Sequence, residues 1–336
     1  MPFLSNAPKI TYKKPIFCVI LGNTQISTIP GISGAGSTPE KTLLTPNLDA
    51  ELVTTGRITS FPLKPNTPTG CPTPASITRA MIELTGVPPL FINAGLKYQL
   101  TVPYLDALGQ IGEDPRKSDA VPLAKNLFCR GQEIGKLLSW SSDLLVLGEC
   151  VPGGTTTALC VLRALGYPAT VSSSFVQNPV SLKEAFCRQA LTDITADSIT
   201  DPFEIVKRVG DPMIPVAAGI ACTYTGTLVL AGGTQMLAVC SVIKAINGPI
   251  PSVATTVYVR DDRTANVQVL AAMMGISMYY VDPGFGKLGH DGLARYCHGE
   301  VKEGTGAGGA MFMACMMGFT PEQIQKKIIE TVLAYS

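Results

Sequence analysis

Short, continuous apolar runs recur along the chain, and they constrain its fold more than any other feature. A run without polar alternation is typical of a strand buried on both faces, because each face then needs apolar side chains. Amphipathic helical patterns fall between several of the runs, and strands that alternate with helices form a parallel sheet covered on both sides. We therefore predict an α/β fold with a mainly parallel β-sheet covered by helices on both faces, and ligand binding beyond the carboxyl ends of its strands. The runs cover residues 16–21, 90–93, 144–147, 170–173, 228–230, 253–259 and 276–281, and the helical patterns cover 74–84, 156–165, 234–245 and 265–274.

The length of the chain and its C-terminal pattern set the expected domain organisation. At 336 residues the chain can form one large α/β domain or two smaller ones. We predict an α/β core over residues 1–300, and a Gly-rich loop followed by C-terminal helices over 301–336 that pack on this core. The last helix is expected over 321–334, where Thr320 and Gln323 form a capping box. Segments rich in Pro, Gly, Ser and Thr predict long loops at 28–46, 61–74 and 172–179.

The balance of apolar and charged residues excludes several classes of protein. Apolar residues make up 46% of the chain and charged residues only 15%, so the chain can bury enough apolar surface to fold. Its formal net charge of +1 supplies no field that would attract nucleic acid or anionic lipid. No apolar run approaches the ~18 residues of a membrane span, and the N-terminus lacks the apolar region of a signal peptide. The expected partner is therefore a small molecule, not nucleic acid or a membrane.

The cysteines and histidines argue against a metal site. The chain has 10 cysteines without any C-x-x-C spacing, and several stand in apolar runs, where free cysteine packs as a small hydrophobe. Unpaired cysteines are typical of a reducing compartment, so we expect a cytoplasmic protein. The 2 histidines, His290 and His298, have no zinc-ligand spacing to a cysteine.

The first Gly-rich loop, GECVPGGTTT over residues 148–157, lies between an apolar run and a helical pattern. Such a loop presents backbone N–H groups and the positive end of a helix to an anion. It partly fits the phosphate-binding pattern G-x-x-x-x-G-K-[ST], but Gly154 stands where that pattern has its lysine, and Glu149 stands inside the loop. A nucleoside triphosphatase is therefore disfavoured, whereas a monophosphate needs less cationic compensation. The alternative is an ordinary strand-to-helix turn capped by threonine.

The second Gly-rich loop, KEGTGAGGAM over residues 302–311, satisfies G-x-G-x-x-G with Gly304, Gly306 and Gly309. A dinucleotide-binding loop follows a strand, and the residues before this loop do not form a convincing one. The loop is better explained as the start of a helix with Glu303 just before it. Glu303 is then either a partner of the helix dipole or a general base held over a ligand.

Other turns contain glycines or acidic residues that admit both a structural and a functional explanation. Gly232 and Gly233 form a third strand-to-helix turn that can present backbone donors, although such turns favour glycine in any case. Asp211 is followed by proline, which is typical of a turn or a helix cap. Asp261 and Asp262 resemble the acidic pair that binds ribose in diphosphate-using phosphoribosyltransferases, but the neighbouring arginines favour a salt-bridged turn.

Taken together, the loops resemble the motifs of the nicotinate-nucleotide:dimethylbenzimidazole phosphoribosyltransferase family, and more closely its divergent branch in archaea and some bacteria. The family patterns are close to G-E-x-x-x-G-N-T-T, G-G-F-E and G-E-G-T-G-A. They correspond here to residues 148–156, a Gly-Gly pair at 232–233, and 302–307. The resemblance runs from about residue 15 to about residue 320, and its last motif is the most specific. The chain departs from the family at Gly154, in place of asparagine, and at Lys302, in place of the first glycine.

The resemblance implies an enzyme that transfers a 5-phosphoribosyl group from nicotinate mononucleotide to a benzimidazole-type base, giving the α-ribazole phosphate of the cobalamin lower ligand. It also implies a Rossmann-like sheet, a nucleotide-binding core over residues 1–300, a homodimer, and neither metal nor cofactor. Glu303 would be the general base that takes a proton from the incoming base, and Glu149 would stabilise positive charge at the anomeric carbon of the ribose. The phosphate and ribose would contact Gly153, Gly154, Thr155, Thr156, Gly232, Gly233, Gly304, Thr305 and Gly306.

The segment expected to bind the acceptor base differs most from the family pattern. By the same resemblance the base would contact Pro72, Thr73 and Arg79, in a segment that differs clearly from the familiar form. A purine acceptor or a different donor therefore stays open beside benzimidazole. Two further alternatives stay open: a homologue that binds a nucleotide without turning it over, and a degenerate P-loop or dinucleotide enzyme.

Overall fold

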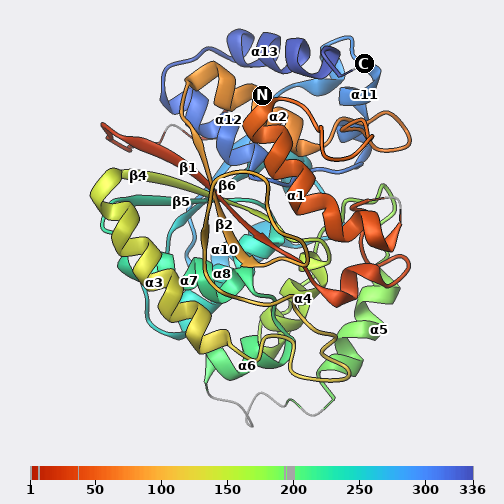
Figure 1. Ribbon diagram of the computed structural model, residues 1–336, viewed down its shortest axis with the longest axis vertical. Coiled ribbons are helices and arrows are strands. Elements are labelled where there is room, and N and C mark those ends of the chain that lie inside the picture. The colour runs from red at the N-terminus through yellow and green to blue at the C-terminus, as the bar shows by residue number, and fades with distance from the viewer. Residues whose placement is uncertain (1, 7, 37, 193, 195–200, 336) are drawn as a thin grey trace.

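A seven-stranded parallel sheet forms the centre of the protein in the computed structural model, which describes residues 2–6, 8–36, 38–192, 194 and 201–335 (Figure 1). The strand order within these residues is β3-β2-β1-β4-β5-β6-β7, and every neighbouring pair is parallel. The order reverses between β1 and β4, so the sheet is Rossmann-like and has a switch point at the carboxyl ends of these two strands. The strands are β1 (Pro15–Gly22), β2 (Pro89–Gly95), β3 (Tyr104–Asp106), β4 (Leu144–Cys150), β5 (Thr227–Ala231), β6 (Ser252–Thr256) and β7 (Met278–Val281).

Most of the predicted strands are confirmed, because their apolar runs pack against helices on both sides. β4 is buried along its whole length. On β1, Phe17 and Val19 enter the core on one face of the sheet and Cys18 enters the core on the other, as the period of two in a strand requires. The run at 253–259 ends as a strand at Thr256, because the Thr256 hydroxyl accepts a hydrogen bond from the backbone of Val259 and begins the short helix α9 (Val257–Arg260).

The predicted strand at 170–173 is wrong, because lysine side chains bond its backbone where a neighbouring strand would. These residues form an irregular connection between helices. The carbonyl oxygen of Ser172 accepts a hydrogen bond from Lys183 Nζ, and that of Ser173 accepts one from Lys302 Nζ. Buried backbone carbonyls need a partner, and here the ammonium groups satisfy them without a β-ladder.

One face of the sheet is covered by the first two helices of the chain and the last two (Figure 1). The predicted capping box at the start of the last helix is confirmed in both of its hydrogen bonds. The predicted loop over 28–46 is wrong from Pro39 onward, because Thr38 caps a helix there with its hydroxyl and proline occupies the first helical position. These helices are α1 (Pro39–Thr55), α2 (Pro74–Thr85), α12 (Ala307–Met316) and α13 (Pro321–Leu333).

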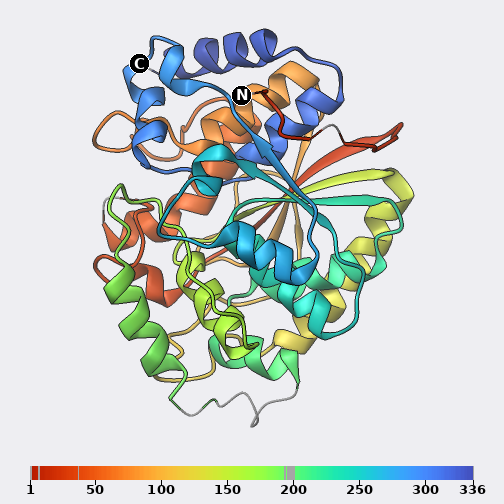
Figure 2. The same ribbon diagram turned by 180° about the vertical axis from the view of Figure 1, so that it is seen from behind.

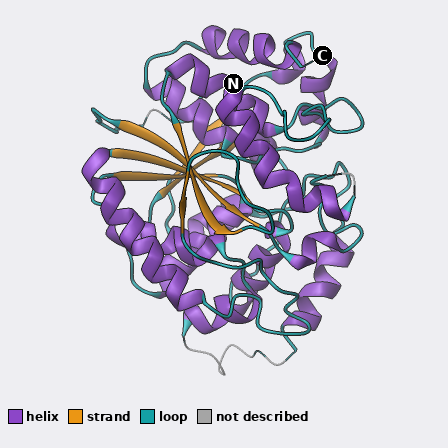
Figure 3. Cartoon of the chain, viewed as in Figure 1, coloured by secondary structure: helices purple, strands orange, loops and turns teal. Residues whose placement is uncertain are grey.

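The opposite face is covered by a larger group of helices, so that helices lie on both sides of the strands (Figures 2 and 3). This confirms the predicted α/β architecture, whereas the boundary at residue 300 stays a prediction. Within the described ranges no helix is long and apolar enough to cross a membrane. The helices of this face are α3 (Ala124–Ser141), α4 (Gly154–Ala164), α5 (Val180–Ala190), α6 (Pro202–Val209), α7 (Met213–Thr223), α8 (Thr234–Ala245) and α10 (Val267–Met274), and the remaining short elements are η1 (Gln25–Thr28), η2 (Phe285–Lys287), α11 (Asp291–Ala294) and η3 (Arg295–His298).

Candidate active site

A cavity of about 1170 Å³ opens at the carboxyl ends of the central strands, next to the switch point. The loop after β4 and the turn after β5 form part of its wall, and the Gly-rich loop before α12 forms another part. Segment 172–177 and the residues from 63 to 70 complete the wall together with α1. All three Gly-rich loops singled out from the sequence therefore meet at one cavity.

The glycines of the loop after β4 allow its backbone to pack closely where the loop enters α4. Gly153 has a φ of +82°, and a Cβ there would lie 2.6 Å from the hydroxyl of Thr24. Gly154 is the first residue of α4, and a Cβ there would lie 2.3 Å from Oε1 of Gln235. Gly153 thus disfavours a side chain through its backbone conformation, a side chain at Gly154 would displace the amide of Gln235, and the N-terminus of α4 faces the cavity with its positive end.

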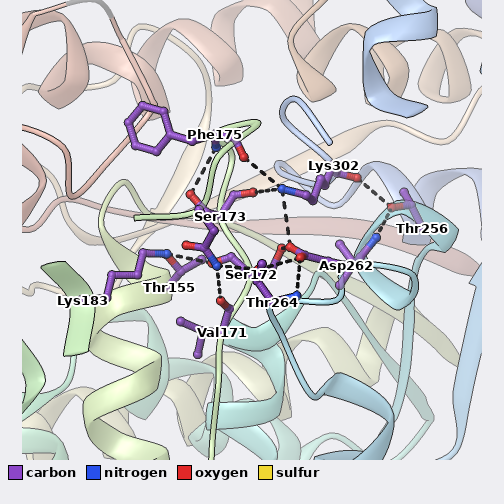
Figure 4. Close-up of polar contacts among 12 residues, drawn as sticks. Thr155, Val171, Ser172, Ser173, Phe175, Lys183, Thr256, Asp262, Thr264 and Lys302 are labelled. Atoms are coloured by element: carbon purple, nitrogen blue, oxygen red, sulfur yellow. Dashed lines mark hydrogen bonds and ion pairs between the residues drawn. The ribbon is translucent and has the colours of Figure 1, made fainter. Parts of the chain in front are cut away.

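Lys183 supplies the positive charge that the loop sequence lacks. It comes from α5, is only 1% exposed, and donates hydrogen bonds to Thr155 Oγ1 at 2.9 Å and to the Ser172 carbonyl at 2.8 Å (Figure 4). Burial lowers the pKa of Lys183 from its usual 10.5 to about 7, and the nearby Lys302 lowers it further while Asp262 opposes the change. The sequence analysis missed this residue, although a lysine on the apolar stripe of α5 with Phe186 was a usable signal.

Glu149 and Glu303 are neighbouring carboxyl groups in the cavity wall. Glu149 lies near the end of β4, and its Oε2 accepts hydrogen bonds from Gln235 Nε2 at 2.5 Å and from the Val151 backbone at 3.2 Å. Burial raises the pKa of Glu149 to about 8, the bond from Gln235 opposes this, and the charges of Glu303 and Asp211 add to it. These surroundings therefore favour the protonated form of Glu149 at neutral pH.

Glu303 lies half-buried at the N-terminus of α12. Its carboxylate accepts hydrogen bonds from the backbone of Gly308 at 3.0 Å, from that of Gly304 at 3.2 Å, and from Thr255 Oγ1 at 3.3 Å. Burial raises the pKa of Glu303 to about 7, although these donors favour the charged form. The prediction that Glu303 stands just before a Gly-rich helix is confirmed, and a carboxyl group that titrates near neutrality is suited to accept a proton.

Unusual backbone conformations cluster beside Glu303. Among the described residues, five that are not glycine have positive φ, and three of them are Val301 at +66°, Lys302 at +65° and Thr305 at +50°. Such conformations cost about 1–3 kcal/mol each and persist where surrounding contacts impose them. Here the Thr305 backbone N–H donates to the Glu149 carbonyl at 3.0 Å, so the two carboxyl-bearing loops are tied together.

Lys302 holds segment 172–177 against the same loop. Its ammonium group donates to the carbonyls of Ser173 at 2.6 Å and Phe175 at 3.1 Å, and it lies 3.5 Å from Asp262 (Figure 4). Asp262 in turn accepts a hydrogen bond from the Ser172 hydroxyl at 2.6 Å. Asp262 is therefore part of a structural network, and the salt-bridged turn predicted around it is confirmed by the ion pair between Arg260 and its neighbour Asp261.

The structure brings most of the predicted site residues together and leaves others outside the cavity wall. Of those left outside, Gly232 packs against the Glu149 side chain, and Gly306 packs against Gly148 on the neighbouring strand. Thr156 is buried, and its hydroxyl has no hydrogen-bond partner within the described ranges. The cavity wall contains Glu149, Gly153, Gly154, Thr155, Gly233, Glu303, Gly304, Thr305 and Thr73.

Two of the residues expected to bind the base form hydrogen bonds within the protein. The carbonyl of Pro72 accepts a hydrogen bond from the Tyr296 hydroxyl at 2.9 Å. The guanidinium of Arg79 donates to the carbonyl of Thr54 at 2.8 Å and pairs with Glu83. Arg79 therefore lies outside the cavity and is not placed to contact a ligand there. Only Thr73, just before α2, reaches the cavity wall.

Asp49 is a further carboxyl group in the cavity wall that the sequence analysis missed. It lies on α1, is buried, and its Oδ2 accepts hydrogen bonds from Thr305 Oγ1 at 2.6 Å and from Cys150 Sγ at 3.4 Å. Burial raises the pKa of Asp49 to about 6, against the effect of these donors and of Thr73. Asp211 is equally buried, but it bonds Thr157 and the start of α7, which confirms the predicted capping role.

In the part of the chain that the structure describes, no group of three or more His, Cys, Asp or Glu side chains is arranged to hold a metal ion. Glu149 and Glu303 are bonded to backbone, hydroxyl and amide donors, and Glu300 pairs with Arg295.

The chain is similar in sequence to archaeal proteins and in fold to a solved enzyme. No protein-family model matches it. A UPF0284 protein of Methanosarcina mazei is 42% identical over 333 residues, which cover 96% of this chain and 95% of that protein. A UPF0284 protein of Methanothermobacter thermautotrophicus is 41% identical over 341 residues, covering 97% and 95%. The solved structure of a nicotinate-nucleotide-dimethylbenzimidazole phosphoribosyltransferase from Thermus thermophilus aligns with a TM-score of 0.63 over 96% of this chain and 83% of that one, at 13% identity, which shows a shared fold.

Proposed function

The chain belongs to the UPF0284 family, and from this premise and the geometry of the cavity we propose that it is a phosphoribosyltransferase. Its donor would be nicotinate mononucleotide, and its acceptor a benzimidazole-type or purine base. One observation carries the proposal: a carboxyl group with a pKa near neutrality, Glu303, shares a cavity with the Gly-rich start of α4, where Thr155 accepts a hydrogen bond from the buried Lys183. The fold shared with the Thermus enzyme supports the same proposal.

The phosphate of the mononucleotide would bind at the N-terminus of α4, beside Thr155 and its partner Lys183. Gly153 and Gly154 leave room for close approach, and Thr155 lies within hydrogen-bond distance of the Lys183 ammonium. A phosphate placed there would take up hydrogen bonds from the N-terminus of α4 and from the lysine, and its charge would favour the protonated lysine. A monophosphate can thus be held without a lysine in the loop itself.

The transfer step balances with Glu303 as the proton acceptor. The bond between the pyridinium nitrogen and the anomeric carbon breaks, and nicotinate leaves with the electron pair. One ring nitrogen of the acceptor base forms the new bond to the anomeric carbon, while the proton on its other ring nitrogen passes to the Glu303 carboxylate. General base catalysis of this kind contributes about 10²–10⁴-fold to the rate.

Glu149 would act on the charge of the ribose. A cationic centre develops at the anomeric carbon as the glycosidic bond lengthens, and a nearby carboxylate stabilises it. The pKa of Glu149 is about 8 in the ligand-free protein, and a cationic pyridinium in the cavity favours its ionised form. Glu149 then stabilises the transition state from the ring side of the sugar, separately from the proton transfer at Glu303.

The test measures nicotinate release and the ribosylated product by mass spectrometry. Purified protein is mixed with nicotinate mononucleotide and either 5,6-dimethylbenzimidazole or adenine, without added metal. We expect both products with at least one acceptor, and a loss of about 10²–10⁴-fold for Glu303→Gln. The matched control is Glu330→Gln, at an exposed carboxylate on α13, which should keep the activity of the unchanged protein.

Other outcomes would separate the alternatives. Folded protein that binds the mononucleotide but releases no nicotinate with either acceptor would contradict the transferase and favour a non-catalytic nucleotide-binding homologue. Tighter binding of ATP or NAD than of the mononucleotide would favour the degenerate P-loop or dinucleotide enzyme. A homodimer and a cytoplasmic location belong to the same proposal, and sedimentation velocity of the purified protein tests the first of these.

A further inference from the structure

One end of the cavity combines an apolar wall with a buried acid, and its chemistry bears on the acceptor of the proposed reaction. Leu48 and Asp49 on α1 line this end together with Thr73, which donates a hydrogen bond to Asp49, and Ile58 and Leu63 also belong to the cavity wall. Apolar walls of this kind bind a flat aromatic ring, and the few polar groups among them fix its orientation and its identity. Asp49 is the charged group in this set, so its hydrogen-bonding capacity bears directly on which ring is accepted.

This end of the cavity is continuous with the loop that carries Glu303. Gly304 packs against Pro74 at the start of α2, where an added Cβ would lie 3.2 Å from the Pro74 ring. Thr305 bonds Asp49 through its hydroxyl at 2.6 Å. A base whose reacting ring nitrogens face Glu303 would therefore extend its far edge along the wall that contains Asp49.

Asp49 has hydrogen-bonding capacity left for a ligand. The bonds from Thr305 and Cys150 both go to Oδ2, and Thr73 is a further donor. A carboxylate offers about four lone-pair sites. No lysine, arginine or histidine in the described ranges forms an ion pair with Asp49, and a buried carboxylate without such a partner is expensive unless donors satisfy it.

We infer that Asp49 determines acceptor specificity by accepting a hydrogen bond from a donor group on the edge of the base remote from its reacting nitrogens. The inference rests on the proposed phosphoribosyl transfer. The preferred acceptor is then a fused heteroaromatic base that bears an amine or a comparable N–H donor. A base that bears only methyl groups at that edge would remove water from Asp49 without forming a hydrogen bond to it. A site that accepts a hydrogen bond from its substrate rejects analogues without the donor group.

The experiment compares 5-aminobenzimidazole with 5-methylbenzimidazole, because the two substituents have similar size and differ in hydrogen bonding. For the unchanged protein we expect kcat/KM to favour the amine by about 10- to 100-fold. In Asp49→Asn, which keeps the volume and an acceptor for Thr305, this preference should fall to within about 3-fold, because kcat/KM for the amine falls by a larger factor than kcat/KM for the methyl compound. A purely structural role for Asp49 would lower both activities by the same factor and would overturn the inference.

Two further measurements keep the test independent of folding and of turnover. The preference of the unchanged protein needs no variant, and equal kcat/KM for the two acceptors would refute the inference directly. If no acceptor yields nicotinate, the proposed transfer fails, and calorimetric binding of the two bases to the unchanged protein then decides on Asp49. Tighter binding of the amine that is lost in Asp49→Asn supports its role, and equal affinities contradict it.

Discussion

Replacing Lys183 by methionine should stabilise the ligand-free protein at neutral pH and weaken its hold on phosphate. The pKa of Lys183 falls from its usual 10.5 to about 7 on folding, because burial disfavours the ammonium form. At pH 7 this difference costs about 4 kcal/mol of folding free energy. Methionine has a similar length and no charge, so it removes this cost. The substitution also leaves the Ser172 carbonyl without its donor, which costs about 1–3 kcal/mol, so the net expected gain is about 1–3 kcal/mol.

The pH dependence of this gain has a definite sign. Between pH 7 and pH 10.5 the unfolded chain holds the proton of this lysine more tightly than the folded protein does, so the free energy of unfolding rises with pH across that range. From pH 7 to pH 9 the unchanged protein recovers about 2 kcal/mol from this group. The advantage of Lys183→Met should therefore shrink by that amount at pH 9.

Urea unfolding at pH 7 and pH 9 measures the stability change, and calorimetric titration with nicotinate mononucleotide measures binding. Loss of a charge-assisted hydrogen bond should weaken binding by about 10- to 100-fold. Lys326→Met serves as the control, since Lys326 is an exposed lysine on α13. A variant that is less stable than the unchanged protein at pH 7 and binds the mononucleotide equally well would show that Lys183 is a structural cation and not a ligand for phosphate.

Three further predictions concern the carboxyl groups and the first Gly-rich loop. The pKa of Glu149 is raised to about 8, so its protonation stabilises the folded state below the ordinary glutamate pKa, and this stability is lost as pH rises through 8. The free energy of unfolding, measured with urea, should therefore fall between pH 5.5 and pH 8, and in Glu149→Gln this fall should be smaller by about 3 kcal/mol. The pKa of Glu303 is about 7, so kcat/KM for nicotinate release should rise as the pH approaches 7, whereas a flat profile from pH 5.5 to pH 7 would argue against Glu303 as the base. Gly154→Ala places a Cβ 2.3 Å from Gln235 Oε1, so it should displace Gln235 from Glu149, cost about 1–3 kcal/mol of stability and lower mononucleotide affinity; an unchanged melting temperature and affinity would contradict the packing argument.

The strands could be predicted because their signal is local. The run Leu144–Leu147 is apolar at every position, and a strand buried on both faces is the structure that such a run fits. The run at 170–173 failed because strand formation also needs a neighbour to pair with, and here Lys183 and Lys302 bond the backbone instead. α3 was not predicted, because Gly131 weakens the helical pattern of its sequence. In the fold the same glycine allows α3 to approach the Val216 carbonyl on α7 closely.

Only those site residues that stand next to one another in a loop could be predicted from the sequence. Glu303 and the glycines around it are adjacent in the chain, so their pattern could be read directly. Asp49 reaches the cavity from α1, and Lys183 on α5 bonds Thr155 in its wall, but their partners Thr305 and Thr155 are distant in sequence. Contacts of this kind are created by the tertiary fold. In a single sequence the one sign of them is a charged residue on an otherwise apolar helical stripe.

Two acids of the cavity wall, and the lysine bonded to Thr155 in that wall, have pKa values that converge from opposite directions. Lys183 falls to about 7, and Glu149 and Glu303 rise to about 8 and about 7. Near neutral pH Lys183, Glu149 and Glu303 therefore exchange protons readily, while Arg295 and Glu300 form an ion pair in the same cavity wall. A zwitterionic mononucleotide entering the cavity would drive a proton onto the lysine and protons off the acids, so these three groups acquire their working charges only as the ligand arrives.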